Sequence, residues 1–143
     1  MDMSQVIAKL KAQKIRITVS RKSLIDIFLS MHAPLSAEEL DFQLKSRGHQ
    51  VNKTTIYREL DFLKQHHLIH EIDLGDGKKR FENALGDHHH HLICNTCRKI
   101  EELDCHPLEK ALSKFEKTLG LTHGYTKVRH SLEFFGICQD CRR

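Results

Sequence analysis

The chain has 143 residues, which suits one ordinary domain or two small ones. Lysine and arginine exceed aspartate and glutamate by 23 to 19, and this net charge of +4 permits nucleic-acid binding without indicating it. No apolar run has the length of a membrane span, and no signal peptide opens the chain. We therefore expect a cytoplasmic protein with no membrane partner, in which the five cysteines favour metal ligation over disulfides.

The first 67 residues have helical patterns. Apolar side chains recur at helical spacing over residues 6–10 and again over residues 18–30. Ser36 and Glu39 form a capping box that begins a third helix, and Asn52 can cap a fourth. This part of the chain therefore predicts four helices.

The pattern changes after residue 67. Residues 68–74 and 78–82 flank the turn Gly75-Asp76-Gly77, which predicts a β-hairpin. Helix, turn, helix and hairpin in this order predict a winged helix-turn-helix. The predicted boundaries are residues 1–82 for this domain, 83–87 for a hinge and 88–143 for a second domain.

The second domain mixes both kinds of element. Residues 91–94 and 99–103 predict short strands, Pro107 begins a helix that ends near Gly120, and residues 125–135 predict a further strand. The expected fold class is therefore α+β, with a winged helix followed by a small α/β domain.

Four of the five cysteines form two C-x-x-C pairs, Cys94 with Cys97 and Cys138 with Cys141. This spacing lets both thiolates of a pair reach one ion at about 2.3 Å, and two pairs complete a tetrahedral zinc site. Because four sulfurs leave no position for a substrate, the predicted zinc is structural. The alternative, redox dithiols, lacks a thioredoxin-like context. Cys105 is left over and is expected to be a small buried apolar residue.

Four consecutive histidines precede the first C-x-x-C pair. On a strand His89 and His91 would face one way and His88 and His90 the other, so one run could supply two metal sites. Carboxylates and a histidine elsewhere could add ligands, and such mixed donors suit iron, manganese or zinc. The alternative is a solvated loop that binds metal adventitiously. The additional candidates are Glu82, Glu102, Glu109 and His130.

The start of the fourth predicted helix is rich in groups suited to DNA. Helix N-termini offer backbone donors to phosphate, and a recognition helix presents its first turns to base edges. The alternative is a capped surface helix with a half-buried Tyr57. The candidate contacts are Lys53, Thr54, Thr55, Tyr57 and Arg58.

In their order and spacing, these motifs resemble the ferric uptake regulator family of metal-dependent repressors. The resemblance covers residues 15–141. It implies a homodimer with an N-terminal winged helix and a small α/β dimerisation domain that holds zinc on four cysteines. Metal at the hinge would close two DNA-binding domains onto a palindromic operator in double-stranded DNA. The matching segments are Arg16-Ile17-Thr18 with Arg21, Leu35 to Leu40, Thr54 to Leu60, Gly75 to Gly77 with Arg80-Phe81-Glu82, His88 to Cys94 with Cys97, and His130-Ser131-Leu132 with Gly136 and Cys138.

The resemblance also implies roles for single residues. Tyr57 would contact thymine methyls, Arg58 would contact phosphates, and Arg16 would reach the minor groove. The implied metal sites are a sensor site of Glu82, His89, His91 and Glu102, a second site of His88, His90, Glu109 and His130, and structural Zn2+ on Cys94, Cys97, Cys138 and Cys141.

The chain departs from the family pattern at the sensor site. Many members have a ligand histidine where this chain has Pro34, and His32, two residues upstream, is the candidate replacement. His90 replaces an aspartate common in iron sensors, and the four-histidine run also resembles zinc sensors. Zinc sensors, however, often place a cysteine near Glu82, and none is present here. Two carboxylates without a cysteine favour Fe2+ over Zn2+ or Mn2+ as the regulatory metal.

The predicted function is a metal-responsive DNA-binding repressor of metal-homeostasis genes, with iron as the favoured signal and zinc or peroxide sensing as alternatives. A metal-storage protein or a zinc hydrolase are the alternatives of another class. The chain has no H-E-x-x-H motif, nucleophile elbow or phosphate-binding glycine loop, so we expect neither an enzyme nor a small-molecule substrate.

Overall fold

A computed structural model describes residues 1–31, 33–75, 77–86 and 89–142 of the chain. It divides into two compact units, Met1–Gly86 and Asp87–Arg143. None of the helices formed by the described residues is both long enough and apolar enough to cross a membrane.

Four capped helices begin the first unit. Each has a polar N-cap residue whose side chain accepts a hydrogen bond from a backbone amide three residues later, which satisfies one of the free donors at a helix start. The capping box predicted from Ser36 and Glu39 is confirmed, because both of its reciprocal hydrogen bonds are present. The helices are α1 (Met3–Ala12), α2 (Val19–Ser30), α3 (Ala37–Ser46) and α4 (Lys53–Gln65).

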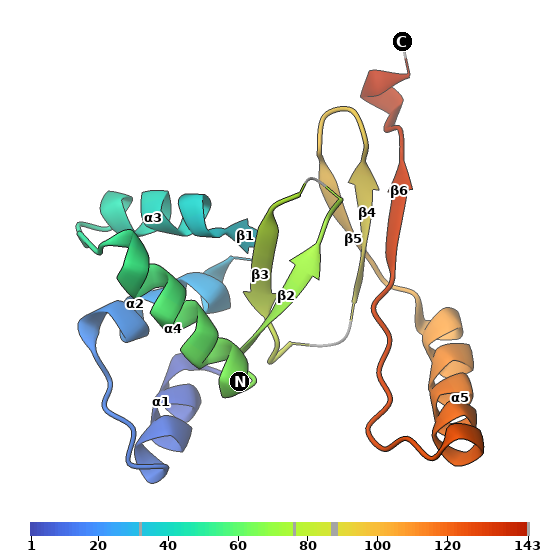
Figure 1. Cartoon of the computed structure of the whole chain (residues 1–143). Coiled ribbons are helices and arrows are strands. Elements are labelled where there is room, and N and C mark those ends of the chain that lie inside the picture. The colour runs from blue at the N-terminus through green and yellow to red at the C-terminus, as the bar shows by residue number, and fades with distance from the viewer. Residues whose placement is uncertain (32, 76, 87–88, 143) are drawn as a thin grey trace. The chain divides into compact units, whose positions relative to one another are not determined.

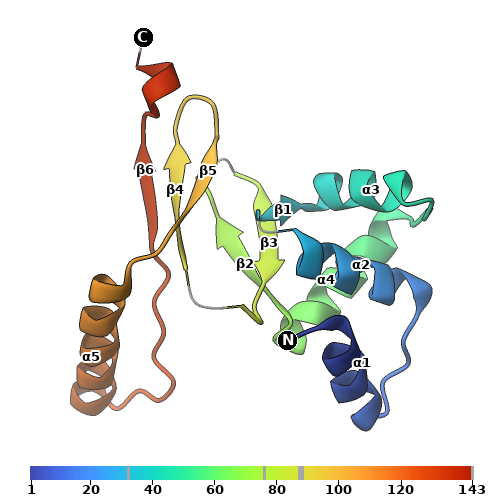
Figure 2. The same ribbon diagram turned by 180° about the vertical axis from the view of Figure 1, so that it is seen from behind.

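A three-stranded antiparallel sheet completes this unit. Its strands are β1 (Leu35–Ser36), β2 (Ile69–Asp73) and β3 (Lys79–Asn83), in the order β1-β3-β2. The predicted hairpin is therefore confirmed as the wing of a winged helix-turn-helix, although Asp76 lies outside the described residues. Both views show the helices gathered on one side of the sheet (Figures 1 and 2).

A single apolar core joins helices and sheet in the first unit. Leu24, Leu40, Leu60 and Phe81 come from α2, α3, α4 and β3, and all are buried in one cluster. The core-facing side of α4 also buries Ile56 and Leu63, so the opposite side of this helix is left for contacts outside the unit.

The second unit contains a small mixed sheet, a long helix and a 3₁₀ turn. The central strand β4 pairs antiparallel with β5 and parallel with β6, as both views show (Figures 1 and 2). The elements are β4 (His90–Cys94), β5 (Ile100–Leu103), α5 (His106–His123), β6 (Glu133–Gly136) and η1 (Gln139–Cys141).

Three predictions for the second unit are wrong in detail. The strand expected over residues 125–135 forms only as Glu133–Gly136, because its partner β4 is five residues long and earlier residues meet no strand. The helix continues to His123 and ends at Gly124, whose left-handed φ of 73° suits a glycine cap. Cys105 is half-buried at the start of α5 and is not a core residue.

Candidate metal centres and nucleic-acid interface

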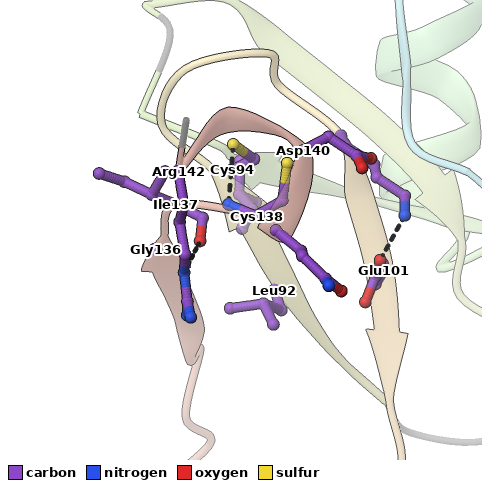
Figure 3. A pocket seen from close by; sticks show the side chains of 11 residues that line it. Leu92, Cys94, Glu101, Gly136, Ile137, Cys138, Asp140 and Arg142 are labelled. Atoms are coloured by element: carbon purple, nitrogen blue, oxygen red, sulfur yellow. Dashed lines mark hydrogen bonds and ion pairs between the residues drawn. The ribbon is translucent and has the colours of Figure 1, made fainter.

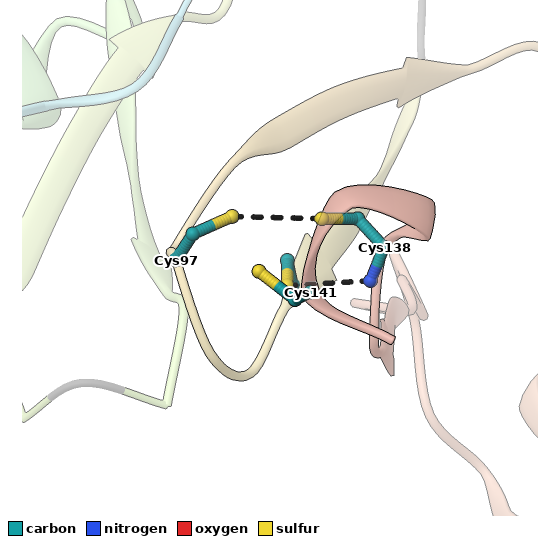
Figure 4. A group of neighbouring side chains, drawn as sticks. Cys97, Cys138 and Cys141 are labelled. Carbon is teal, nitrogen blue, oxygen red and sulfur yellow. Dashed lines mark hydrogen bonds between the residues drawn. The ribbon is translucent and has the colours of Figure 1, made fainter. Parts of the chain in front are cut away.

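The four paired cysteines lie at one end of the second sheet. Cys94 ends β4, and the chain turns there through Arg98, whose φ is 63°. The amide of Arg98 donates to the Cys94 carbonyl at 2.9 Å, which closes the tight turn, or knuckle, that carries Cys94 and Cys97. Cys138 follows β6, and the amide of Cys141 donates to its carbonyl at 3.0 Å. Because β4 and β6 run parallel and end together, both knuckles meet at the same place (Figure 4).

Their sulfurs form one cluster. The four Sγ atoms all lie within 4.8 Å of one another, and those of Cys97 and Cys138 are 3.7 Å apart. The amide of Cys138 also donates to the Sγ of Cys94 at 3.4 Å. A closed set of four sulfurs on two knuckles is the donor set that structural zinc takes, so the residues fit the ion predicted from their spacing.

Within this cluster, the thiols of Cys94 and Cys141 have pKa values shifted in opposite directions. Backbone hydrogen bonds, first from Cys138 and then from Cys97, lower the pKa of Cys94 to about 5. Hydrogen bonds to the neighbouring sulfurs, above all Cys138, raise the pKa of Cys141 to about 12. Thiolate ligation requires loss of such protons, so an ion that binds here displaces them.

A second cluster joins β4, α5 and the segment before β6. His90 is only 2% exposed, and its Nε2 lies 2.5 Å from Oε1 of Glu109. Nε2 of His130 lies 3.3 Å from the same oxygen. The ligand atoms of these three residues all lie within 4.8 Å of one another, whereas His88 lies outside the described residues.

Hydrogen bonds on the far sides of both rings orient this second cluster. Nδ1 of His90 lies 3.0 Å from the carbonyl oxygen of Leu132, and Nδ1 of His130 lies 2.8 Å from Oε1 of Glu116. A carbonyl can only accept a hydrogen bond, so the contact with Leu132 requires Nδ1 of His90 to donate and leaves Nε2 as the nitrogen that faces Glu109. Metal-binding histidines in proteins commonly use this arrangement.

The residues predicted for the sensor belong to both units. In the second unit, His91 is buried on β4 and pairs in register with Glu102 on β5, which is exposed. The rings of His89 and His91 meet edge to face, with centroids 5.0 Å apart. In the first unit, Glu82 is buried on β3. His32 lies outside the described residues.

Sequence reasoning missed two residues that contact the predicted ligands. His70 lies opposite Glu82 across the hairpin, with Nε2 and Oε1 2.5 Å apart. Glu116 contacts His130 and lies two helical turns after Glu109 on α5. The hairpin register and the seven-residue spacing are the signals that could have identified them.

A shallow hollow lies beside the cysteines on the surface of the second unit (Figure 3). Its volume is about 600 Å³, and it is lined by apolar Leu92 and Ile137 together with charged groups. Lys99 and Glu101, which line it too, form an ion pair of 2.7 Å. It therefore combines apolar surface with paired charge.

The predicted DNA-contacting residues lie in the first unit. On α4, Tyr57 is 41% exposed and Arg58 is exposed, on the side away from the core. Lys53 and Thr54 are exposed as well, whereas Thr55 is half-buried and its amide donates to the Asn52 cap at 2.8 Å. Arg16 is exposed between α1 and α2.

The chain is similar in sequence to known proteins over nearly its whole length. A family model described as the ferric uptake regulator family matches residues 12–135. The chain is 31% identical over 144 residues to the ferric uptake regulation protein of Neisseria meningitidis, covering 99% of this chain and 96% of that protein. It is 27% identical to the peroxide operon regulator of Bacillus subtilis over 99% of this chain and 94% of that protein. It is 29% identical to the zinc uptake regulation protein of Mycobacterium tuberculosis over 93% of this chain and 99% of that protein.

The fold also matches solved structures. The ferric uptake regulator of Helicobacter pylori superposes with a TM-score of 0.78 at 21% identity, covering 99% of this chain and 91% of that one. This similarity shows that the chain has the same fold.

Proposed function

Because the chain belongs to the ferric uptake regulator family of metal-responsive transcription regulators, we propose that it is a homodimeric repressor in which Fe2+ binding increases affinity for a palindromic operator. The proposed sensor ligands are Glu82, His89, His91 and Glu102, with His32 as a further candidate. The proposal depends most on strand β4. His90 contacts Glu109, whereas the next residue, His91, lies in register with Glu102 on β5, and side chains of successive strand residues point to opposite faces.

The sensor donors would connect the two units. Glu82 belongs to the DNA-binding unit, and the other donors belong to the second unit. An ion shared by both would restrict the angle between the units. In a dimer this angle sets the separation of two reading helices, which must match half-sites about one helical turn apart or a multiple of it.

Exposed apolar residues support dimerisation through the second unit. No residue of the 18-residue helix α5 is buried, and Phe115 and Leu121 are exposed on it. Phe135 and Ile137 are exposed near the end of β6. Apolar surface of this kind usually marks a protein interface, and a second copy with two-fold symmetry would suit a palindromic operator.

The donor chemistry supports iron. Glu82 and Glu102 supply oxygen and the two histidines supply nitrogen, a harder set than one containing cysteine. Raw affinity would still favour zinc over iron, so preference in vitro does not identify the physiological metal. Metal analysis of protein purified from its native host tests the iron assignment, and zinc alone in the sensor site would favour the zinc-sensing alternative.

The other two clusters have separate proposed roles. The four cysteines would hold structural Zn2+. His90, Glu109 and His130, with His88, would hold a second divalent ion that ties β4 to α5. Neither cluster includes a residue from the DNA-binding unit, so we assign neither of them the sensing role.

A mobility-shift titration with the double variant His89→Ala with His91→Ala tests the function. Wild-type protein should bind operator DNA more tightly when Fe2+ is added under anaerobic conditions. The double variant should lose this response but keep its zinc and remain a dimer. His106→Ala is the matched control, because His106 is an exposed histidine on α5 outside all three clusters.

Two results would contradict the proposal. A double variant that responds to Fe2+ with wild-type affinity would move the sensor elsewhere, with His88, His90, Glu109 and His130 as the next candidates. Metal binding by the wild-type protein without any DNA affinity would instead favour a storage protein.

A further inference from the structure

Arg21 and Glu59 form a largely buried ion pair within the DNA-binding unit. They are 38 residues apart in the chain, on α2 and α4. Nε of Arg21 donates to Oε2 of Glu59 at 2.7 Å, and Nη2 donates to Oε1 at 3.2 Å. The two side chains are only 13% and 10% exposed. This is the two-pronged geometry that guanidinium and carboxylate groups favour.

The same guanidinium also holds the segment before α2. Nη1 of Arg21 donates to the backbone carbonyl of Arg16 at 2.7 Å. The guanidinium carbon lies 3.5 Å from the ring centroid of Phe62, one turn after Glu59 on α4. One side chain therefore joins the main chain at Arg16 to α4, and lysine could not reproduce this set of contacts.

Stability alone does not explain the pair. A buried ion pair usually stabilises a fold no better than apolar residues of similar volume, because both charges must be removed from water. A buried pair can, however, fix one geometry among several. Glu59 directly follows Arg58 and lies two residues after Tyr57, so the geometry fixed here includes the turn of α4 that carries the proposed base and phosphate contacts.

We propose that Arg21 and Glu59 are positioning residues for operator recognition. They hold the main chain at Arg16 in fixed register with α4, so that Arg16 and Tyr57 engage the same half-site without reordering. This inference rests on the proposed DNA contacts of both residues. Ile15 and Ile17 also pack against the core, so loss of the pair should loosen the Arg16 segment rather than release it.

The decisive variant replaces both charges, Arg21→Met with Glu59→Leu. It leaves no buried charge without a partner, so the variant should fold and melt at or above the wild-type temperature. Its affinity for the operator should fall about tenfold, the scale of one misplaced specific contact, while its affinity for random DNA stays the same. Arg21→Lys should give a smaller loss. The control Arg47→Gln with Asp26→Asn removes an ion pair of 2.6 Å between Arg47, the residue that follows α3, and Asp26 on α2, and should bind as the wild type does.

A double-mutant cycle with Arg16→Ala separates positioning from general damage to α4. If the pair acts through Arg16, its removal should cost little further affinity once the Arg16 side chain is gone. An equal loss in both backgrounds, or wild-type operator affinity in the charge-free variant, would overturn the inference. If Arg16→Ala alone binds the operator as the wild type does, the proposed Arg16 contact fails, and the inference fails at its premise.

Discussion

The exposed side of α4 carries two kinds of proposed DNA contact, and single substitutions can separate them. Tyr57→Ala should weaken operator binding more than random-DNA binding, by about 1–3 kcal/mol for a lost base contact. Arg58→Ala should weaken binding to both DNAs. It should also reduce the salt dependence, because binding with one phosphate contact fewer releases fewer counterions from the DNA. Fluorescence anisotropy titrations with both DNAs at several salt concentrations would measure this. Unchanged operator affinity in both variants would exclude α4 as the reading element.

Glu39 links the start of α3 to the wing and gives a pH-dependent prediction. Burial alone would raise the pKa of Glu39, but hydrogen bonds from the Ser36 amide and from Arg80, both 2.7 Å, bring it below the usual value of 4.5. A carboxylate whose pKa is lower in the folded protein stabilises the fold at pH values above its pKa in the unfolded chain. This stabilisation decreases as the pH falls through the pKa of the folded state. Glu39→Gln should therefore be less stable than the wild type at neutral pH, and the difference should shrink as the pH falls below about 4.5 and be lost only below the lowered pKa of the folded protein.

Urea unfolding followed by circular dichroism across this pH range measures the difference. Glu38→Gln is the control, because Glu38 is exposed and its contact with Lys53 is long, at 3.9 Å. A gap between Glu39→Gln and the wild type that persists unchanged in acid would contradict the assigned role of the carboxylate.

Among helices and strands, features that depend on neighbouring residues could be predicted from the sequence, whereas those set by distant partners could not. The capping box at Ser36 and the two cysteine knuckles each involve residues three apart, and both have the expected local geometry. The length of β6 is set by β4, some forty residues earlier, so alternation over residues 125–135 predicted too long a strand. The Arg21–Glu59 pair depends on how α2 packs against α4, which no local pattern shows.

The cysteine cluster brings the end of β4 together with Cys138 and Cys141 near the end of the described chain, so the proposed zinc can be tested through the stability of the second unit. Cys138→Ser should release a tightly held zinc ion and unfold or monomerise the second unit, because the binding energy of a structural zinc site is folding energy. Cys105→Ser is the control, because Cys105 lies outside the cluster. Metal content and mass by light scattering would be measured together. Zinc loss without a change in oligomeric state would contradict the structural role.

In the whole molecule, the proposed sensor requires metal and DNA to be thermodynamically linked. If an ion shared by both units favours the operator-binding arrangement, metal must tighten operator binding and operator must tighten metal binding by the same factor. Couplings of this kind typically amount to about 5- to 150-fold. The coupling factor can be measured in two ways: from the operator affinity with and without Fe2+, and from the Fe2+ affinity with and without operator. The two measurements should give the same factor.

Glu82 is the residue on which this linkage should depend most, because it is the sensor donor that the DNA-binding unit contributes from the described residues. Glu82→Gln should retain some Fe2+ binding through His89, His91 and Glu102 of the second unit, but that binding should no longer respond to operator. Glu101→Gln is the matched control, since Glu101 neighbours Glu102 on β5 and points to the opposite side of the strand. If Glu82→Gln keeps the wild-type coupling factor, the ion does not act by joining the two units. A mechanism confined to the second unit, such as metal-dependent dimerisation, would then replace the one proposed here.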